Sequence, residues 1–191
     1  MPEVVFPLDS QKKFTEQRIV GHNRWHPDIP ALVQVKPGDV FRVHCREWFD
    51  GAIHNDDSAE DVRDAPLTTV HALSGPFAVD GAEPGDLLIV DILDVGPIPG
   101  EDSGPLAGQG WGYTGIFAKK NGGGFLTDQF PDAYKAIWDF SGQEATSRHI
   151  PAVRFTGIVH IGLMGTAPSA ELLAKWNRRE AALIATDPDR V

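Results

Sequence analysis

The chain has 191 residues, and its charge and composition already exclude several classes of protein. Hydrophobic residues make up 41% and charged residues 23% of the sequence, which is typical of a soluble globular protein and not of a coiled coil or a disordered tail. The 27 acidic residues exceed the 17 basic ones, and the net charge of −10 repels phosphate backbones and disfavours nucleic-acid binding. No apolar run approaches the roughly 18 residues that span a bilayer, so we expect no membrane partner. The amino terminus lacks a basic region followed by an apolar segment, so we expect a cytoplasmic protein.

Glycine and proline are frequent, and cysteine is nearly absent. The 20 glycines and 15 prolines indicate many turns and favour a β-rich architecture over a helix bundle. The only cysteine, Cys45, excludes an intrachain disulfide and a cysteine-rich zinc site. The length suits one domain, and we expect residues 1–191 to form a single β-rich domain.

Two similar turns organise the first half of the chain. Lys36-Pro37-Gly38-Asp39 and Glu83-Pro84-Gly85-Asp86 each place Pro and Gly at the central positions of a type II turn. The turns lie 47 positions apart, which indicates either a weak internal repeat or, as we favour, the same turn used twice. Apolar runs and turn signals predict strands over 35–46, 70–79, 86–95 and 153–163. The segment 86–95 is almost wholly apolar, so we expect it to be buried on both faces.

Two helices are expected in the second half of the chain. Pro131 at a helix-start position, with Ala133, Ile137 and Phe140 at helical spacing, predicts a short helix near 131–139. An apolar stripe after Ser169 predicts a longer helix near 169–185. Together these elements predict an α+β, β-dominated fold in which strands joined by Pro-Gly turns form a sandwich or barrel-like domain.

Cys45 alternates with Phe41 and Val43 along an expected strand. This pattern places the thiol on the core face, and free cysteines are commonly buried. We therefore expect Cys45 to be buried and not catalytic.

His22 and His26 stand four positions apart, a spacing that binds zinc on a helix. Pro27 disfavours the helical conformation at His26, so this interpretation is poor. Two interpretations stay open. The loop either lines a cleft with Trp25 as a wall, or it holds a hydrogen-bonded histidine packed on Trp25.

The densest polar cluster is the loop 50–61. Its aspartate and asparagine oxygens, with the nitrogen of His54, are suitable metal ligands. The alternative is an acidic surface loop. The loop follows Trp48 and Phe49 at the end of an expected strand, a place where a cleft would form. His71 lies inside another expected strand, where a histidine is either a ligand or a satisfied core residue.

Short segments distributed from Gly21 to the final helix carry a family resemblance. The most specific one is Gly81-Ala82-Glu83-Pro84-Gly85-Asp86. The others are 22–27, Asp50-Gly51 with Asn55-Asp56, 73–76, 115–117, 121–126, 136–138, 148–151 and 165–169. Together they resemble the acetamidase/formamidase family, with formamidase the nearer likeness because of segments 121–126 and 136–140.

The resemblance implies hydrolysis of small linear amides, with formamide and water giving formate and ammonia. It also implies homo-oligomers and, in some relatives, a divalent metal, for which zinc and calcium are the candidates. Members of the family are longer, with an acidic Gly-Asp-Gly-Glu motif in their later half. We therefore expect this chain to be the amino-terminal part of such an enzyme, inactive alone, with the carboxy-terminal part as its partner.

The chain offers no Gly-x-Ser-x-Gly elbow and no phosphate-binding glycine loop. With the cysteine expected in the core, a water activated by a metal or a carboxylate is the natural nucleophile. The rival hypotheses are a non-catalytic metal-binding β domain and a structural fragment of a split amidase; a cupin-like metal enzyme lacks its close His-x-His pair. The expected site comprises the catalytic residues Asp50, His22 and Asp56, the metal ligands Asp50 and His71, and the substrate-pocket residues Trp25, Asn55 and Gly75.

Overall fold

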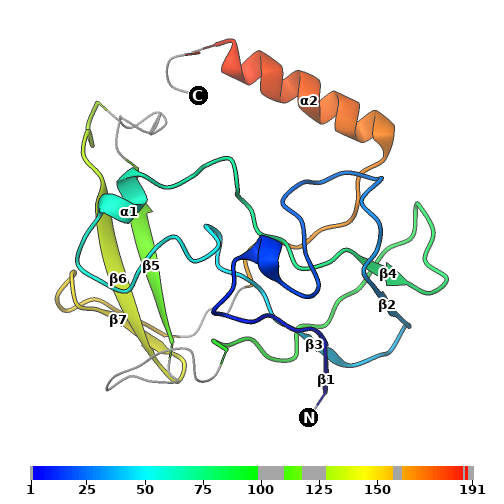
Figure 1. The fold of residues 1–191 in the computed structure, drawn as a ribbon, viewed down its shortest axis with the longest axis horizontal. Coiled ribbons are helices and arrows are strands. Elements are labelled where there is room, and N and C mark those ends of the chain that lie inside the picture. Colours follow the sequence, from blue (N-terminus) through cyan, green and yellow to red (C-terminus); the bar gives the residue numbers. More distant parts are fainter. Residues whose placement is uncertain (1, 99–109, 118–127, 157–160, 187, 189–191) are drawn as a thin grey trace. The chain divides into compact units, whose positions relative to one another are not determined.

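The computed structural model describes residues 2–98, 110–117, 128–156, 161–186 and 188. Its elements in chain order are β1 (Glu3–Phe6), the 3-10 helix η1 (Phe14–Glu16), β2 (Val33–Val35), β3 (Phe41–Val43), α1 (Glu60–Arg63), β4 (Phe77–Val79), β5 (Trp111–Ile116), β6 (Tyr134–Ser141), β7 (Glu144–Ser147), β8 (Arg154–Thr156) and α2 (Ala170–Ile184). Strands outnumber helices among these elements (Figure 1), which confirms the β-dominated α+β class.

The chain divides into two compact units. Unit 1 consists of Met1–Gly51, Pro66–Leu93 and Ala167–Ala170, and unit 2 consists of Ala52–Ala65, Asp94–Thr166 and Glu171–Val191. Each unit is built from segments that are distant in the sequence, and we describe each by itself. That residues 1–191 form a single domain stays a prediction.

Unit 1 contains two small parallel sheets. Strand β1 pairs with β3, and β2 pairs with β4 in a register that sets Val33 opposite Phe77. The ring of Phe77 lies 6.2 Å from that of Phe6 and stacks on Phe41 at 6.0 Å. Phe6 is fully buried. These aromatic contacts join the two sheets and form the core of the unit.

Both Pro-Gly turns form as the sequence predicts. The N–H of Asp39 donates to the carbonyl of Lys36 at 3.0 Å, and the N–H of Asp86 donates to the carbonyl of Glu83 at 3.1 Å. Each closing aspartate also accepts the N–H of the first turn residue, at 2.8 Å from Lys36 and 2.9 Å from Glu83. The central glycines have φ of +86° and +106°, the region that glycine adopts without steric cost.

A strand precedes each turn, but the spacings of the strands and of the turns differ. Strand β2 ends immediately before the first turn, whereas three residues separate β4 from the second, and the parallel pairing sets Val33 opposite Phe77, 44 positions away and not 47. That the chain uses the same turn twice stays the favoured prediction. After the first turn the chain continues into β3. After the second turn it continues through residues 87–93, which are neither strand nor helix.

The expected strands were therefore too long, and one was wrong. The range 35–46 contains the end of β2 and all of β3, and 70–79 contains only β4. The range 86–95 contains no strand, and its residues are exposed instead of buried, apart from Val95, which is half-buried. Of 153–163, residues 154–156 form β8, and 157–160 lie outside the described residues. An apolar run gives a chain the capacity to form a strand, but the strand exists only where a second backbone pairs with it.

Unit 2 is built on an antiparallel sheet in the order β5-β6-β7-β8. Ala136 and Ile137 of β6 are buried, as is Val62 of α1. Gly115 of β5 leaves room for Val62, because a Cβ there would lie 3.1 Å from a methyl group of that valine. The short helix thus covers the sheet through one apolar side chain.

The helix expected near 131–139 is wrong, because residues 134–141 form the central strand β6. The spacing of Ala133, Ile137 and Phe140 fitted a helix. However, Tyr134, Ile137, Trp138 and Phe140 are also strong strand formers. Pairing with β5 on one side and β7 on the other decides for the strand.

The longer helix is confirmed as α2, Ala170–Ile184. Its apolar stripe is less covered than expected, since Leu173 and Trp176 are half-buried and no residue of the helix is buried. Among the described residues, no helix combines the length and the apolar character that crossing a membrane requires.

The expected burial of Cys45 is wrong, since the residue is exposed. Strand β3 ends at Val43, so the alternation that predicted burial does not extend to position 45. Partial desolvation nevertheless raises the pKa of the thiol, partly offset by a hydrogen bond with Ser74. A raised pKa keeps the thiol protonated at neutral pH, as expected for a cysteine that is not a nucleophile.

Gly21 provides a test of packing in unit 1. The next residue, His22, forms an antiparallel bridge with Leu73, and a Cβ on Gly21 would lie 2.1 Å from the Phe14 ring and 2.4 Å from the Leu73 carbonyl oxygen. We expect Gly21→Ala to lower the free energy of unfolding by about 1–3 kcal/mol, because overpacking displaces both neighbours. Gly96→Ala is the matched control, since a Cβ there meets nothing within 4 Å. Equal urea midpoints for the two variants would contradict the prediction.

Candidate functional site

His22 lies beside the segment that carries two other predicted site residues. Its backbone N–H donates to the carbonyl of Leu73 at 3.1 Å, and its carbonyl accepts the N–H of Leu73 at 2.8 Å. His71 and Gly75 flank Leu73 in sequence. Thus unit 1 brings together His22 and the segment 71–75, although about 50 positions separate them in the chain.

The His22 ring has a fixed tautomer. Its Nδ1 lies 2.7 Å from the carbonyl oxygen of Arg24, and because a carbonyl only accepts, Nδ1 carries the hydrogen. The lone pair of the neutral ring is therefore on Nε2. Histidines that bind metals or take protons are commonly oriented in this way, by a hydrogen bond from the opposite nitrogen to a backbone carbonyl.

His71 stacks on an aromatic residue next to the predicted metal ligand. Its ring lies 4.9 Å from that of Trp48, with an interplanar angle of 10°. Trp48 also contacts Phe49, whose ring centroid is 4.8 Å away and whose side chain is buried. Asp50 follows Phe49 directly in sequence. The segment that carries Asp50 therefore also carries Trp48, the residue on which His71 stacks.

The carboxylate of Asp50 is anchored by cationic and backbone donors. The Nε of Arg46 donates to it at 2.8 Å, and the N–H of Phe14 lies 3.0 Å from both of its oxygens. Arg46 also donates to the backbone carbonyl of Asp50 at 3.2 Å. The φ of +58° at Asp50 is one that aspartate tolerates better than most residues. These bonds fix the position of Asp50, and its role as a ligand or base stays a prediction.

The two pocket residues predicted in unit 1 occupy different surroundings. Trp25 is half-buried on a loop that is tied down where Asn23 and Arg24 donate to the carbonyl of Thr68. Gly75 is buried, and a Cβ there would lie 3.0 Å from the ring of Phe77. Their roles in a substrate pocket are untested.

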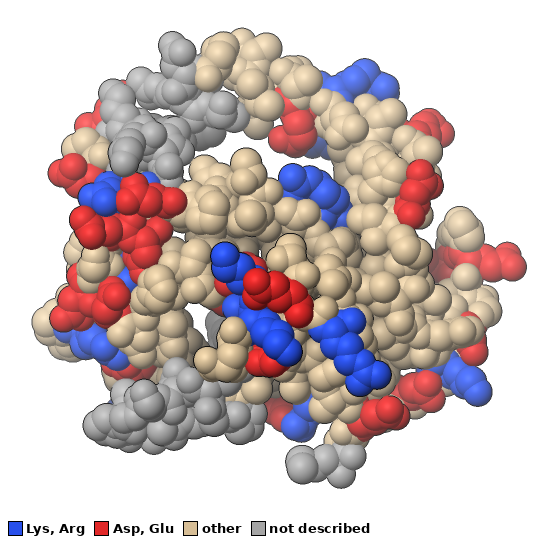
Figure 2. Space-filling model, viewed as in Figure 1, with Lys and Arg blue, Asp and Glu red and all other residues tan. Residues whose placement is uncertain are grey.

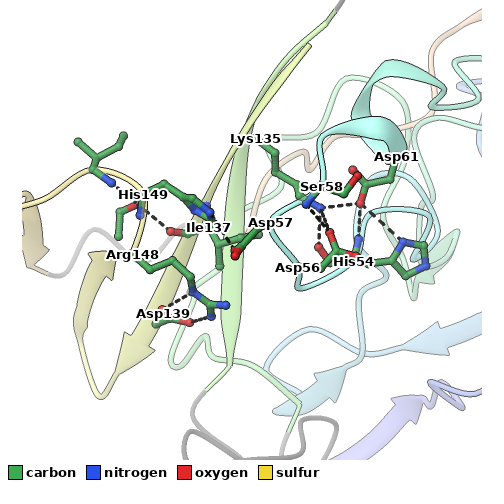
Figure 3. Close-up of polar contacts among 12 residues, drawn as sticks. His54, Asp56, Asp57, Ser58, Asp61, Lys135, Ile137, Asp139, Arg148 and His149 are labelled. Atoms are coloured by element: carbon green, nitrogen blue, oxygen red, sulfur yellow. Dashed lines mark hydrogen bonds and ion pairs between the residues drawn. The ribbon is translucent and has the colours of Figure 1, made fainter.

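Residues 52–61 of the acidic loop belong to unit 2, and part of this segment surrounds a buried lysine (Figure 3). The Nζ of Lys135 on β6 donates to the carbonyl of His54 at 2.9 Å, to Asp56 at 2.8 Å and to Asp61 at 2.7 Å. The side chain of Lys135 is 0% exposed and that of Asp61 is 10% exposed. An ammonium group has three N–H donors, so every donor of this buried cation is satisfied. The interpretations of the loop as a metal site and as a surface loop both omitted this internal cation.

Asp56 lies at the exposed edge of this cluster, and Asn55 beside it is exposed. The Lys135 ammonium holds the pKa of the Asp56 carboxyl below its ordinary value, and a bond from the Ser58 N–H acts in the same direction. A carboxylate with a lowered pKa is a weaker base. Figure 2 shows acidic side chains gathered over the part of the molecule where α1 lies in Figure 1.

A second histidine ties the same loop to the sheet. His149 accepts the N–H of Ile137 through Nδ1 at 3.0 Å, so its Nε2 carries the hydrogen and donates to Asp57 at 3.1 Å. Beside it, Arg148 donates to both carboxylate oxygens of Asp139 on β6. Figure 3 shows Lys135 and His149 holding the acidic loop at two places along β6.

Sequence reasoning gave neither Lys135 nor His149 a role in the site. Lys135 was missed because its segment was assigned to a short helix near 131–139. The useful signal was the excess of acid in 56–61, since buried carboxylates need a cation and Lys135 is the basic residue of an otherwise apolar run.

The expected site residues are divided between the units. Asp50, His22, His71, Trp25 and Gly75 belong to unit 1, while Asn55 and Asp56 belong to unit 2. Within the described part of the chain, no group of three or more His, Cys, Asp or Glu side chains gathers closely enough to hold a metal. The described residues therefore supply single ligands and not a complete metal site.

Replacing the buried cation tests its contribution to stability. We expect Lys135→Met to lower the free energy of unfolding by about 3–5 kcal/mol, because it leaves the mostly buried carboxylate of Asp61 without its partner. Lys12→Met is the matched control: its ion pair with Asp9 spans 3.0 Å, but the two side chains are 54% and 46% exposed. The control should change the free energy of unfolding only slightly, since exposed ion pairs are screened by water and salt. Equal losses in the two variants, measured by urea denaturation, would refute the assignment.

The lowered pKa of Asp56 predicts a pH dependence. A carboxyl whose pKa is lower in the folded state contributes stability above its unfolded pKa, and loses it as the pH falls through the folded-state pKa. The stability difference between the unsubstituted chain and Asp56→Asn should therefore be constant at neutral pH and shrink below about pH 4. Asp132→Asn serves as the control, because Asp132 is exposed and has no ion pair with any described residue. A difference that grows on acidification would contradict the assignment.

Comparison with known proteins gives a consistent family. The model of the acetamidase/formamidase family matches residues 7–190. The chain is 69% identical over 191 residues to an acetamidase of Mycolicibacterium smegmatis, covering 100% of this chain and 47% of that protein. It is 60% identical over 189 residues to a formamidase of Methylophilus methylotrophus, covering 99% of this chain and 44% of the relative.

A solved structure agrees with these sequences. The gamma lactamase from Delftia acidovorans superimposes with a TM-score of 0.87 at 53% identity, over 99% of this chain and 44% of that one. The chain thus spans less than half the length of the relatives that it matches. Since the family model covers nearly all of its residues, the chain belongs to the acetamidase/formamidase family.

Proposed function

We propose that this chain is the amino-terminal part of an enzyme that hydrolyses small linear amides, with formamide and water giving formate and ammonia. The observation that carries the proposal is the family match over residues 7–190, with an acetamidase and a formamidase among the similar proteins. Because those relatives are more than twice as long, the proposed enzyme includes a carboxy-terminal part as the partner of this chain.

Amide hydrolysis requires a nucleophile, stabilisation of the developing oxyanion and a proton for the departing ammonia. In our proposal water is the nucleophile and His22 takes its proton. The Nδ1–H bond to the Arg24 carbonyl supports this role, since it leaves the lone pair on Nε2. The same nitrogen would then return the proton to the leaving nitrogen.

A divalent metal, zinc or calcium, is part of the proposal, with Asp50 and His71 as its ligands from this chain. An imidazole nitrogen and a carboxylate oxygen are suitable donors for zinc. A complete set would need further ligands, because no group of three gathers among the described residues. When bound, such a metal makes water a better nucleophile by lowering its pKa.

Asp56 is a weaker candidate for the base than His22, because Lys135 lowers the pKa of its carboxyl. We keep Trp25, Asn55 and Gly75 as proposed pocket residues. A substrate as small as formamide gives little binding energy, so its pocket must be narrow and well ordered. Assembly into homo-oligomers and a cytoplasmic location complete the proposal.

A second candidate substrate is a cyclic amide. The gamma lactamase from Delftia acidovorans shares 53% of its matched sequence with this chain and has the same fold over it. The opening of a γ-lactam also breaks a carbon–nitrogen bond by addition of water. The chemical requirements are therefore the same, and only the pocket distinguishes the substrates.

The test of the base uses a joined enzyme, in which this chain is followed by the carboxy-terminal part of the Mycolicibacterium smegmatis acetamidase. We expect His22→Asn to lower kcat by about 100-fold or more, because a positioned general base contributes 10²–10⁴-fold. His26→Asn is the control: this histidine is exposed, and its Nδ1 accepts the N–H of the neighbouring Asp28 at 3.1 Å. Equal rates in the two variants would exclude His22 as the base.

The substrate is tested by release of ammonia from formamide, acetamide and butyramide, and by opening of a γ-lactam, each with and without chelator. We expect formamide to give the highest kcat/KM in the joined enzyme, and the 191-residue chain alone to give no turnover. Preference for the lactam would favour the second candidate. No hydrolysis of any amide by a folded joined enzyme would favour a non-catalytic metal-binding β domain or a structural fragment. Full activity of the 191-residue chain alone would refute the proposal that catalysis needs the carboxy-terminal part.

A further inference from the structure

Each Pro-Gly turn of unit 1 follows a strand and precedes an apolar segment; we call β2 with the residues after it the first copy of this arrangement, and β4 with the residues after it the second copy. In the first copy, β2 is followed by the turn 36–39 and by β3, and β3 pairs with β1. In the second copy, β4 is followed by the turn 83–86 and by residues 87–93, which belong to no strand. The second copy thus has the strand, the turn and an apolar segment, but no counterpart of β1 among the residues that the structure describes.

The segment 87–93 is apolar and exposed in a pattern typical of a strand. Leu87, Ile89 and Leu93 are 87%, 77% and 72% exposed, whereas Leu88, Val90 and Ile92 are 47%, 49% and 50% exposed. Exposure therefore alternates with a period of two, as it does where one face of an extended chain is partly covered and the other is bare. Six of the twenty exposed large hydrophobic side chains among the described residues lie in this segment.

The first copy shows what completes such a segment. Phe41 and Val43 of β3 are half-buried, and β1 supplies the parallel backbone opposite them, with Glu3 facing Phe41 and Phe6 facing Val43. Phe6 of β1 is fully buried at this position. A counterpart of β1 would pair with the backbone of 87–93 in the same way, and its side chains would lie beside those of the segment.

We propose that residues 87–93 are an interaction surface that accepts a strand from the carboxy-terminal part of the protein, paired as β1 pairs with β3. This inference rests on the proposed function only in taking the chain as the amino-terminal part of a longer protein. The similar acetamidase and formamidase support this occupant, because each contains a match to 99–100% of this chain and has more than half of its length beyond the match.

Another molecule of the same chain is a poorer occupant of this surface than the carboxy-terminal part. Two copies related by a two-fold axis would pair this segment antiparallel with itself. Pairing about Val90, the centre of the segment, sets Asp86 of each copy opposite Asp94 of the other. Like charges directly opposite each other on paired strands are destabilising, and they would occur at both ends of this pairing.

Hydrogen exchange tests the proposal without requiring activity. The exchange of the amides of 87–93 is followed by mass spectrometry in the 191-residue chain and in the joined enzyme, with the paired strand β6 as an internal standard. We expect exchange in 87–93 to be at least about 100-fold slower in the joined enzyme, because paired amides exchange only on opening. The amides of β6 should be protected in both proteins.

A double variant and a control test whether the most exposed side chains of 87–93 contribute to the contact with the carboxy-terminal part. Leu87→Glu with Ile89→Glu should leave the urea midpoint of the 191-residue chain unchanged and abolish the added protection in the joined enzyme. Leu67→Glu is the control, because Leu67 is a leucine of unit 1 that is 44% exposed and lies outside the segment 87–93. This variant should preserve the slow exchange of the amides of 87–93 in the joined enzyme.

Each outcome has a distinct meaning. Rapid exchange of 87–93 in the joined enzyme overturns the inference, even if that enzyme hydrolyses amides. Protection without hydrolysis supports the inference and counts against the proposed function. Protection of the 191-residue chain that increases with its concentration, together with a doubled mass, identifies another molecule of the same chain as the occupant and overturns the proposal.

Discussion

The ammonium group of Lys135 is the interaction on which the arrangement of unit 2 depends. Removing a charge from water costs several kcal/mol, and the cost is offset only where the partners have good geometry and every donor is satisfied. The His54 carbonyl, Asp56 and Asp61 provide those partners from one loop, while Lys135 itself belongs to the central strand. A loop with many carboxylates is thereby held against a sheet instead of repelling itself. Arg46 serves Asp50 similarly in unit 1, where a guanidinium and a backbone N–H hold one carboxylate.

Local features of the fold followed from the sequence, and pairing did not. The Pro-Gly turns were predictable because proline and glycine each set a backbone angle within four residues. Helix α2 was predictable because its apolar residues recur on one side over several turns. Strand β6 was not, since Lys135, Ala136 and Ile137 are buried in succession and show no alternation. The same limit applies to 87–93, whose sequence is that of a strand although no described backbone pairs with it.

The candidate site shows a comparable division between residue types and their arrangement. The sequence identified polar residues that suit amide hydrolysis, but not that His22 would lie against Leu73 while Asp56 would pair with Lys135. Such contacts depend on backbone bridges between segments far apart in the chain, which composition does not encode. Glu47 is an example of a supporting residue. Its carboxylate accepts the N–H groups of Phe49 and Gly51, and these bonds shape the turn in which Asp50 lies. The anchoring of a reactive group often involves more residues than the group itself.

The second Pro-Gly turn has a consequence during synthesis of the protein. Its bonds join residues three apart, so the turn needs no distant partner, whereas the apolar residues from Leu87 to Leu93 are exposed wherever no second backbone pairs with them. If the protein continues as its relatives do, about 300 residues follow Leu93, and their synthesis takes about 15–60 s at 5–20 residues per second. Exposed apolar segments aggregate, and flanking charges act as gatekeepers against such association. Asp86, Asp91 and Asp94 lie within and beside the apolar segment, where charges of this kind oppose such association.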